Sequence, residues 1–408
     1  MTQTTDPALD SLHGLSVGDA LGAQFFVPDN HHHLDLRPAP PGVWPWTDDT
    51  EMACSVHAAF TERGAVDTFD LTHAFARRHD FDRGYGPAAN RLLRLVREGG
   101  DAPALAAALF DGRGSFGNGA AMRVAPLGAA FAADPAAVVR PAADTAVITH
   151  THPQAVDGAI AVAVAAAHAV RARTEATDPA GFLRAVGELT PDGAVRRGIA
   201  EAARLLGADA RTAARVLGNG SRVSAADTVP FALWAAARHL DDYPTAIRET
   251  LSAGGDVDTT AAIVGGIVAA RTGTEGIPAA WLAAREPLPA WALPVPGSVA
   301  GPAGEPRTIR LPRPAPVPET VWSEEQWQRT RQGVLPNDPD GVWRAHTREG
   351  VLHLYLAAGG DALVEIAVEP VPGGHGRGWR PVSAVHEAHP AAHRGGAEGL
   401  VETLLRLL

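Results

Sequence analysis

The chain has 408 residues, 46% of them hydrophobic, and its formal net charge at pH 7 is −11. We do not expect such an acidic chain to bind nucleic acid independently of sequence, because that binding relies on basic side chains that neutralise phosphates. Alanine supplies much of the apolar content and no stretch is long and bulky enough to cross a bilayer, so we expect no membrane insertion.

The N-terminus has no basic region ahead of an apolar run, so the sequence predicts no secretory signal. The lone Cys54 excludes an internal disulfide and is typical of a reducing compartment. We therefore expect a cytoplasmic protein.

Helical patterns dominate the chain as far as residue 286. Apolar side chains recur at helical spacing in residues 92–96 and 182–186, and Pro230 is expected in the first turn of a further helix. Glycine and alanine are abundant and allow helix axes to approach closely. Residues 1–286 are therefore predicted to form a compact helical domain.

Residues 46–56 contain the first of two acidic helix starts. Thr47, Asp48 and Asp49 occupy the last loop residues and the first turn before an apolar helix. Side chains of this kind favour helix N-termini for their own sake, because carboxylates there meet unpaired N–H groups and the positive end of the helix dipole. By itself, this segment indicates an ordinary helix cap.

A glycine-rich segment occupies residues 112–123. Glycines let the backbone approach a ligand closely and present N–H groups to phosphate oxygens. The spacing matches neither the Walker loop nor the Rossmann fingerprint. The segment therefore indicates either a ligand-binding loop or a tight turn that leads into a closely packed helix.

Two histidines, His150 and His152, stand before an apolar helix expected over residues 155–173. Either histidine could cap that helix, or one could bind a substrate. The sequence does not rank them.

Residues 254–267 form the second acidic helix start, with Asp256, Asp258 and Thr259 ahead of an apolar helix. If the two starts converge, their carboxylates and threonine hydroxyls provide the hard oxygen ligands that suit Mg²⁺ or Mn²⁺. Repulsion between the carboxylates would make the metal-free cluster costly. Two divalent cations would balance the four charges, so the pair of helix starts predicts a shared metal site.

Beyond residue 286 the composition changes. Ten prolines fall within residues 287–318, which predicts a linker or a segment that wraps over the helical body. Residues 319–408 are predicted to form a small α+β accessory domain of open role, with a core of tryptophans. Its expected elements are strands at residues 351–356, 362–368 and 379–385, a hairpin turn at Gly359 and Gly360, and a helix at residues 397–408.

The four helical-region segments, in this order and together with residues 14–23, resemble the ADP-ribosylglycohydrolase family. The resemblance runs from residue 14 to residue 271. It implies an all-α fold around a binuclear centre of two Mg²⁺ or Mn²⁺ ions. It also implies hydrolysis of the glycosidic bond to the ADP-ribose anomeric carbon, in ADP-ribosylated protein or a small ADP-ribose derivative.

The resemblance further implies roles for individual residues. The metal ligands would be Thr47, Asp48, Asp49, Asp256, Asp258 and Thr259. Asp48 or Asp49 would act in catalysis, by steering the attacking water or taking its proton. The distal ribose and diphosphate would lie on a loop made of Gly114, Ser115, Phe116, Gly117 and Asn118, with Thr149 and His150 beside the substrate.

One position departs from the family pattern. Many members carry a glutamate a few residues after the Gly-Asp motif, and the matching residue here is Phe26, which can neither bind a metal nor move a proton. Asp29 or Glu51 could supply the acid, or the enzyme could work without it. We predict a metal-dependent ADP-ribosyl glycohydrolase; the alternative is a non-catalytic ADP-ribose-binding or immunity-type protein.

Overall fold

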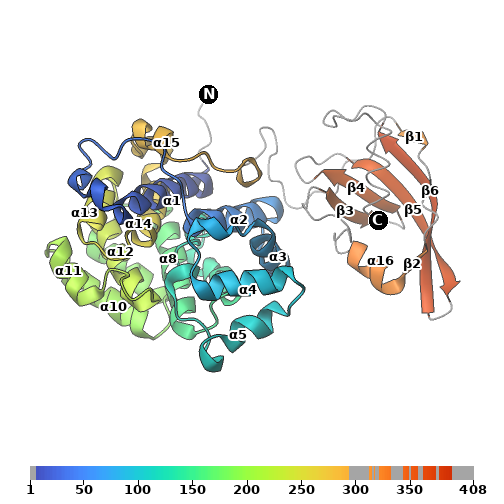
Figure 1. The fold of residues 1–408 in the computed structure, drawn as a ribbon, viewed down its shortest axis with the longest axis horizontal. Coiled ribbons are helices and arrows are strands. Elements are labelled where there is room, and N and C mark those ends of the chain that lie inside the picture. Colours follow the sequence, from blue (N-terminus) through green and yellow to red (C-terminus); the bar gives the residue numbers. More distant parts are fainter. Residues whose placement is uncertain are drawn as a thin grey trace. The chain divides into compact units, whose positions relative to one another are not determined.

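The computed structural model describes residues 6–293, 312–314, 317, 321–331, 343–348, 351–356, 362–373 and 376–387. The chain divides into two compact units, Met1–Pro294 and Val295–Leu408 (Figure 1). Helices build the first unit, and strands dominate the described part of the second. This confirms the predicted fold class, an all-α domain with a smaller C-terminal α+β region. The domain boundaries expected at residues 286 and 319 stay a prediction.

Many helices of the first unit begin at a side chain that caps the first turn. Asp6 precedes α1 and Asp101 precedes α5, and each carboxylate accepts a hydrogen bond from a backbone N–H of the helix. The helices are α1 (Pro7–Ala23), α2 (Asp48–Arg63), α3 (Thr68–Arg78), α4 (Pro87–Arg97), α5 (Ala102–Gly112), α6 (Ala125–Ala130), α7 (Val139–Val147), α8 (Pro153–Arg171), α9 (Pro179–Leu189), α10 (Ala194–Arg204), α11 (Ala210–Leu217), α12 (Ala225–Arg238), α13 (Tyr243–Ser252), α14 (Val257–Thr272) and α15 (Ala279–Ala284).

Helices α1 and α14 pack directly against each other, because α1 presents glycines to α14 (Figure 1). A Cβ on Gly18 would lie 2.1 Å from the Ala261 carbonyl oxygen, and a Cβ on Gly22 would lie 2.5 Å from the Val257 carbonyl oxygen. Only glycine permits this approach. The contacts run in opposite directions along the two helices, so the last turns of α1, with Asp19, lie beside the first turn of α14.

Helix α8 crosses the interior of the first unit. Contrary to the expectation from the sequence, among the described residues this helix is long and apolar enough to span a membrane by length and composition. However, 67% of its most apolar stretch is buried inside the unit. A Cβ on Gly128 of α6 would lie 2.1 Å from the Ala163 carbonyl oxygen, so α6 packs closely on this helix. Helix α8 is therefore the central core helix of the unit.

The expected first-turn position of Pro230 was wrong. Helix α12 begins at Ala225, and Pro230 lies inside it. A proline in a helix interior costs about 3 kcal/mol, because it removes a backbone hydrogen bond. Tertiary packing offsets this cost: Phe231 and Trp234 are fully buried. A Cβ on Gly198 of α10 would lie 2.4 Å from Pro230 Cγ, so α10 packs directly on the proline ring.

The second unit contains an antiparallel sheet in the strand order β1-β6-β5-β4-β3, with β2 paired to β6. The three strands expected from the sequence correspond to β4, β5 and β6, of which the last two are longer than predicted. The elements are β1 (Pro312–Pro314), β2 (Trp322–Ser323), α16 (Glu324–Arg331), β3 (Trp343–Arg348), β4 (Val351–Leu356), β5 (Ala362–Gly373) and β6 (Gly376–Glu387).

Tryptophans pack on one another in this second unit. Trp322 and Trp327 are buried, with ring centroids 5.8 Å apart, and Trp327 stacks on Trp379 at 5.1 Å. Trp322 and Trp327 therefore lie in the core as predicted, and the half-buried Trp379 packs on them. The expected helix at residues 397–408, the turn at Gly359 and Gly360, and most of the proline-rich segment lie outside the described residues.

Candidate functional site

The first turns of α2 and α14 meet the last turns of α1. One carboxylate oxygen from each of Asp19, Asp49 and Asp258 lies within 4.8 Å of the others. The charges of Asp48 and Asp256 also act on Asp49 and raise its pKa. The fold thus brings together the two acidic helix starts predicted from the sequence. We call these five residues the carboxylate cluster.

Asp19 is the member of this cluster that our sequence-based ligand set omitted. Its Oδ2 accepts hydrogen bonds from the backbone N–H groups of Thr47 at 2.9 Å and Thr50 at 3.1 Å. Its Oδ1 accepts one from the Thr47 hydroxyl at 2.8 Å. Asp19 therefore caps α2 from a neighbouring helix and orients Thr47. The Gly18-Asp19 pair, inside the family motif at residues 14–23, was the available signal.

Asp49 is buried and Asp48 is half-buried, and each stands among other carboxylates. Asp49 is 2% exposed, and its Oδ1 has no hydrogen-bond partner. Burial, followed by the charges of Asp19 and Asp258, raises the pKa of Asp49 well above its usual range. Burial and the charge of Asp19 raise the pKa of Asp48 to about 7. An unpartnered buried oxygen among carboxylates is suited to binding a cation, and this oxygen-rich set suits Mg²⁺ or Mn²⁺.

Asp256 does not behave as an ordinary helix cap. It stands at the N-cap of α14, but its side chain makes no capping hydrogen bond. Instead, its Oδ2 accepts a hydrogen bond of 2.6 Å from Asn118 Nδ2, which also lies 3.1 Å from the Thr228 hydroxyl. Burial and the charge of Asp256 raise the pKa of Asp258 well above its usual range. Asn118 thereby ties the glycine-rich segment to the second acidic helix start.

The glycine-rich segment lies on the imidazole of His150. A Cβ on Gly117 would lie 3.1 Å from His150 Nε2, and a Cβ on Gly119 would lie 2.9 Å from His150 Cε1. His150 Nδ1 is 2.7 Å from the Thr149 hydroxyl oxygen. Burial, followed by the charge of Arg123, lowers the pKa of His150 to about 3, so this histidine is neutral at physiological pH.

His152 has a different place. Its Nδ1 accepts a hydrogen bond of 3.1 Å from the Gln154 N–H, so it caps α8. Its ring lies edge-on to that of Phe116, with centroids 5.8 Å apart, and Phe116 is 40% exposed. The structure therefore separates the two histidines that the sequence left unranked: His152 caps the helix, and His150 supports the glycine-rich segment.

A second loop, residues 218–224, also borders the cluster and was missed in the sequence. The Asn219 carbonyl accepts a hydrogen bond of 3.0 Å from the Asp256 N–H. Ser224 forms an antiparallel bridge to Gly117. Val223 has a φ of 53°, which is strained for a β-branched residue. The Gly-Asn-Gly run at the start of this loop was the signal that could have identified it.

Comparison with known proteins identifies the family to which this helical unit is similar. Residues 1–300 match the model of the ADP-ribosylglycohydrolase family. The chain belongs to the ADP-ribosylglycohydrolase family. This confirms the resemblance and the enzyme class predicted from the motifs.

Named relatives and a solved structure of the same family are also similar to this chain. ADP-ribosylhydrolase ARH3 of Bos taurus is 31% identical over 319 residues, which cover 66% of this chain and 86% of that protein. ADP-ribosyl-dinitrogen reductase glycohydrolase of Rhodospirillum rubrum is 27% identical, covering 68% of this chain and 89% of that protein. A solved ADP-ribosylglycohydrolase-related protein complex matches with a TM-score of 0.51 and 28% identity, over 69% of this chain and 92% of that one.

Neither acid considered as a replacement at the Phe26 position of this ADP-ribosylglycohydrolase joins the three grouped carboxylates. Phe26 follows α1 and is 55% exposed, and Asp29 is exposed as well. Glu51 is buried, but its carboxylate accepts hydrogen bonds from the Tyr85 hydroxyl at 2.6 Å and from the Asp80 N–H at 3.2 Å. Glu51 therefore holds the segment after α3 against α2.

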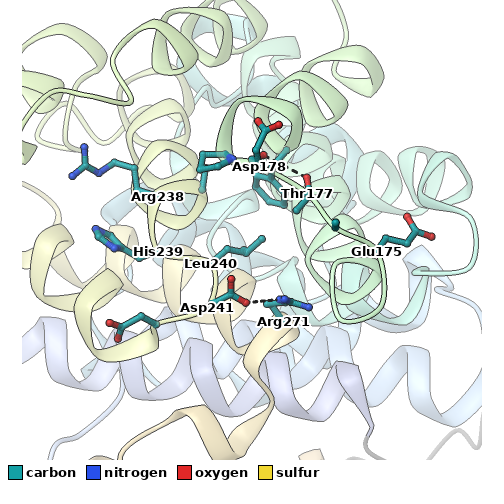
Figure 2. Close-up of a pocket in the computed structure, with 13 residues that line it drawn as sticks. Glu175, Thr177, Asp178, Arg238, His239, Leu240, Asp241 and Arg271 are labelled. Atoms are coloured by element: carbon teal, nitrogen blue, oxygen red, sulfur yellow. Dashed lines mark hydrogen bonds and ion pairs between the residues drawn. The ribbon is translucent and has the colours of Figure 1, made fainter.

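A hollow of about 310 Å³ lies at the far ends of α12 and α14 from the carboxylate cluster (Figure 2). Its charged side chains are already paired: Arg271 Nε is 2.7 Å from Asp241 Oδ1, and Arg238 Nε is 3.1 Å from Glu249 Oε2. Asp178 caps α9. These groups are engaged in holding helix ends together, so we place the functional site of this ADP-ribosylglycohydrolase at the carboxylate cluster.

Proposed function

We propose that this protein is a metal-dependent hydrolase that cleaves the glycosidic bond to the anomeric carbon of ADP-ribose. The observation that carries the proposal is the carboxylate cluster, where the buried Asp49 Oδ1 lacks a partner beside further carboxylates. Family membership and the names of the relatives support the bond type. The proposed substrate is an ADP-ribosylated protein or a small ADP-ribose derivative, and the proposed location is the cytoplasm.

The proposed cofactor is a pair of Mg²⁺ or Mn²⁺ ions. Bound ions would orient the ribose hydroxyls and stabilise the charge that develops on the substrate. We do not propose Asp19 as a ligand, because its two oxygens already accept four hydrogen bonds from Thr47 and Thr50. Its proposed role is to position the Thr47 hydroxyl. The proposed ligands are Thr47, Asp48, Asp49, Asp256, Asp258 and Thr259.

Hydrolysis requires a group that orients the attacking water and takes its proton. Asp48 and Asp49 are the proposed residues, and the contacts of Asp49 favour it as the base. Its Oδ2 lies 3.2 Å from the Thr47 hydroxyl, which fixes the carboxylate, and its Oδ1 has no partner in the protein. Asp49 would therefore serve both as a metal ligand and as the group that orients the attacking water and takes its proton.

The proposed substrate loop is made of Gly114, Ser115, Phe116, Gly117 and Asn118, with Thr149 and His150 beside it. The loop is connected to the cluster through Asn118, so a ligand on its backbone N–H groups would reach the carboxylates. His150 is held neutral, which leaves its imidazole free of a charge that would repel the metal ions. The side chain of Asn118 is engaged with Asp256, so we expect it to act by positioning that residue.

The direct test measures release of ADP-ribose from arginine-linked and serine-linked substrates. We expect hydrolysis of at least one linkage with Mg²⁺ or Mn²⁺ and none in chelator. Calorimetry with free ADP-ribose accompanies the assay. A folded, metal-loaded protein that neither binds ADP-ribose nor cleaves any linkage would rule out the proposed function.

A second candidate is a non-catalytic ADP-ribose-binding or immunity-type protein, and the exposed Phe26 favours it because the usual glutamate is missing. We predict that Phe26→Glu broadens the range of linkages cleaved by an already active wild type, since a restored acid can assist poorer leaving groups. The measurement compares both linkages in wild type and variant. Wild-type inactivity on every linkage, with activity gained in Phe26→Glu, would establish the binding protein instead.

The helical unit should bind ADP-ribose without the second unit. We predict that a chain truncated after Pro294 keeps the full-length affinity in calorimetry. A chain truncated after Glu286 should keep the affinity but lose about 5 °C in Tm. The shorter chain lacks buried Leu288 and Ala292, whose carbonyl is 3.0 Å from His57 Nδ1. Loss of binding in the Pro294 chain, with its helical circular dichroism intact, would show that the second unit contributes to the site.

A further inference from the structure

Arg123 is a charged side chain buried in the helical unit near the carboxylate cluster. It is the last residue of the glycine-rich segment, two residues before α6, and is 0% exposed. Its Nη1 lies 3.2 Å from Met52 Sδ, and its Nη2 donates to the Thr145 carbonyl at 2.8 Å. Its Cζ lies 4.6 Å from the ring centroid of Phe75. Its Nε has no partner.

These direct contacts are all with neutral groups. A buried guanidinium is costly to remove from water unless a negative charge balances it. Burial lowers the pKa of Arg123 to about 9, while the charges of Tyr85 and Asp48 oppose this shift. Tyr85 carries no charge at neutral pH, because burial also raises its own pKa. Of the five aspartates of the carboxylate cluster, Asp48 is therefore the one whose charge acts on Arg123.

The position of Arg123 is consistent with an electrostatic interaction with Asp48 that involves no direct contact. Met52 follows Asp48 by one helical turn on α2, so the two side chains share a face of that helix. The guanidinium on Met52 therefore lies one turn below the first acidic helix start. On its other side, the charge of Arg123 reaches His150, under the glycine-rich segment. The cation thus sits beneath the site and outside hydrogen-bond contact with its carboxylates.

We propose that Arg123 is a built-in counter-ion of the carboxylate cluster. Its positive charge acts on the cluster through Asp48 while no metal is bound, and the same charge weakens the binding of a divalent cation. Arg123 is thus a positioning residue that keeps the empty site folded and the metal exchangeable. The effect on metal exchange rests on the metal centre of the proposed function, whereas the effect on the stability of the metal-free protein does not.

The first arm of the test titrates Mn²⁺ alone into wild type and Arg123→Met at pH 8 by calorimetry. Removal of the repelling charge should raise the affinity for Mn²⁺ by roughly tenfold. Arg123→Lys keeps the charge and should retain an affinity close to that of wild type. A residue that only packed the site would give the opposite sign, because its loss would loosen the ligands. Unchanged or weaker binding in Arg123→Met would overturn the exchange role.

Arg285 provides a matched control. It is 9% exposed and its Nε also lacks a partner, but its pKa responds to Cys54, Tyr243 and Glu286 and not to the carboxylate cluster. Arg285→Met should therefore leave the affinity for Mn²⁺ unchanged.

The second arm uses metal-free protein in chelator. Arg123→Met should lower Tm by about 5 °C or more, and adding Asp48→Asn should recover part of that loss, because one unbalanced carboxylate is removed. Independent packing roles would instead give additive losses, which would overturn the counter-ion. If Arg123→Met does not fold alone, recovery of folding in the double variant supports the proposal and continued failure overturns it. Wild type that does not bind Mn²⁺ would reject the metal centre, while this arm would still decide the role of Arg123.

Discussion

Asp49→Asn is expected to lower kcat by about a thousandfold while changing the affinity for ADP-ribose by less than about threefold. The substitution keeps the shape of the side chain and removes the group proposed to accept the proton. Asp49 Oδ1 is buried and has no partner within the protein, so the substitution breaks no contact between that oxygen and another residue. The two quantities are measured by steady-state hydrolysis of the preferred linkage and by calorimetry with free ADP-ribose.

A matched control is Asp67→Asn, because Asp67 caps α3 as an acid at a helix N-terminus outside the cluster. It should leave kcat unchanged. If Asp49→Asn retained wild-type turnover, the base would have to be another residue, with Asp48 the next candidate. If it lost ADP-ribose binding in proportion to turnover, Asp49 would be a binding residue and not a base.

Asp256→Ala should remove most of the stabilisation that metal confers on the fold. A ligand present at a hundred times its Kd stabilises the native state by about 2.7 kcal/mol, and a variant that no longer binds the metal gains none of this. We therefore expect the variant and wild type to differ in Tm much more in Mn²⁺ than in chelator. The measurement is thermal unfolding of both proteins in the two buffers.

Asp209→Ala is the control for Asp256→Ala. Asp209 caps α11 through a hydrogen bond of 2.9 Å from the Thr212 N–H and lies at the surface. Loss of such a cap costs about 1 kcal/mol, and this loss should be the same in Mn²⁺ and in chelator. An equal loss in both buffers for Asp256→Ala would mean that this residue supports the fold but holds no metal.

The carboxylate cluster illustrates what the sequence could and could not predict. Thr47, Asp48 and Asp49 could be recognised because a helix start has a local signature, and the same holds for Asp256 and Asp258. Their convergence could be inferred because both starts belong to one ordered set of family motifs. The hydrogen bonds of Asp19 could not be predicted, because their four donors belong to Thr47 and Thr50, which are distant along the chain.

The glycine-rich segment and the two histidines were likewise only partly predictable from the sequence. Residues 112–123 were visible as a glycine-rich segment, but a choice between a binding loop and a tight turn required its neighbours. Those neighbours are His150, on which two of its glycines lie, and Asp256, which Asn118 contacts. The roles of His150 and His152 also became distinct only when the fold showed which one caps α8.

The sequence by itself determined the helical class of the first unit, the family and the two acidic helix starts, because capping, hydrophobic periodicity and motif order are properties of neighbouring residues. Only the tertiary structure decided that Asp19 joins those starts, that residues 218–224 border the site, and that Pro230 lies within α12. Each of these depends on burial and on partners from distant segments, and such contacts form only when the helices pack.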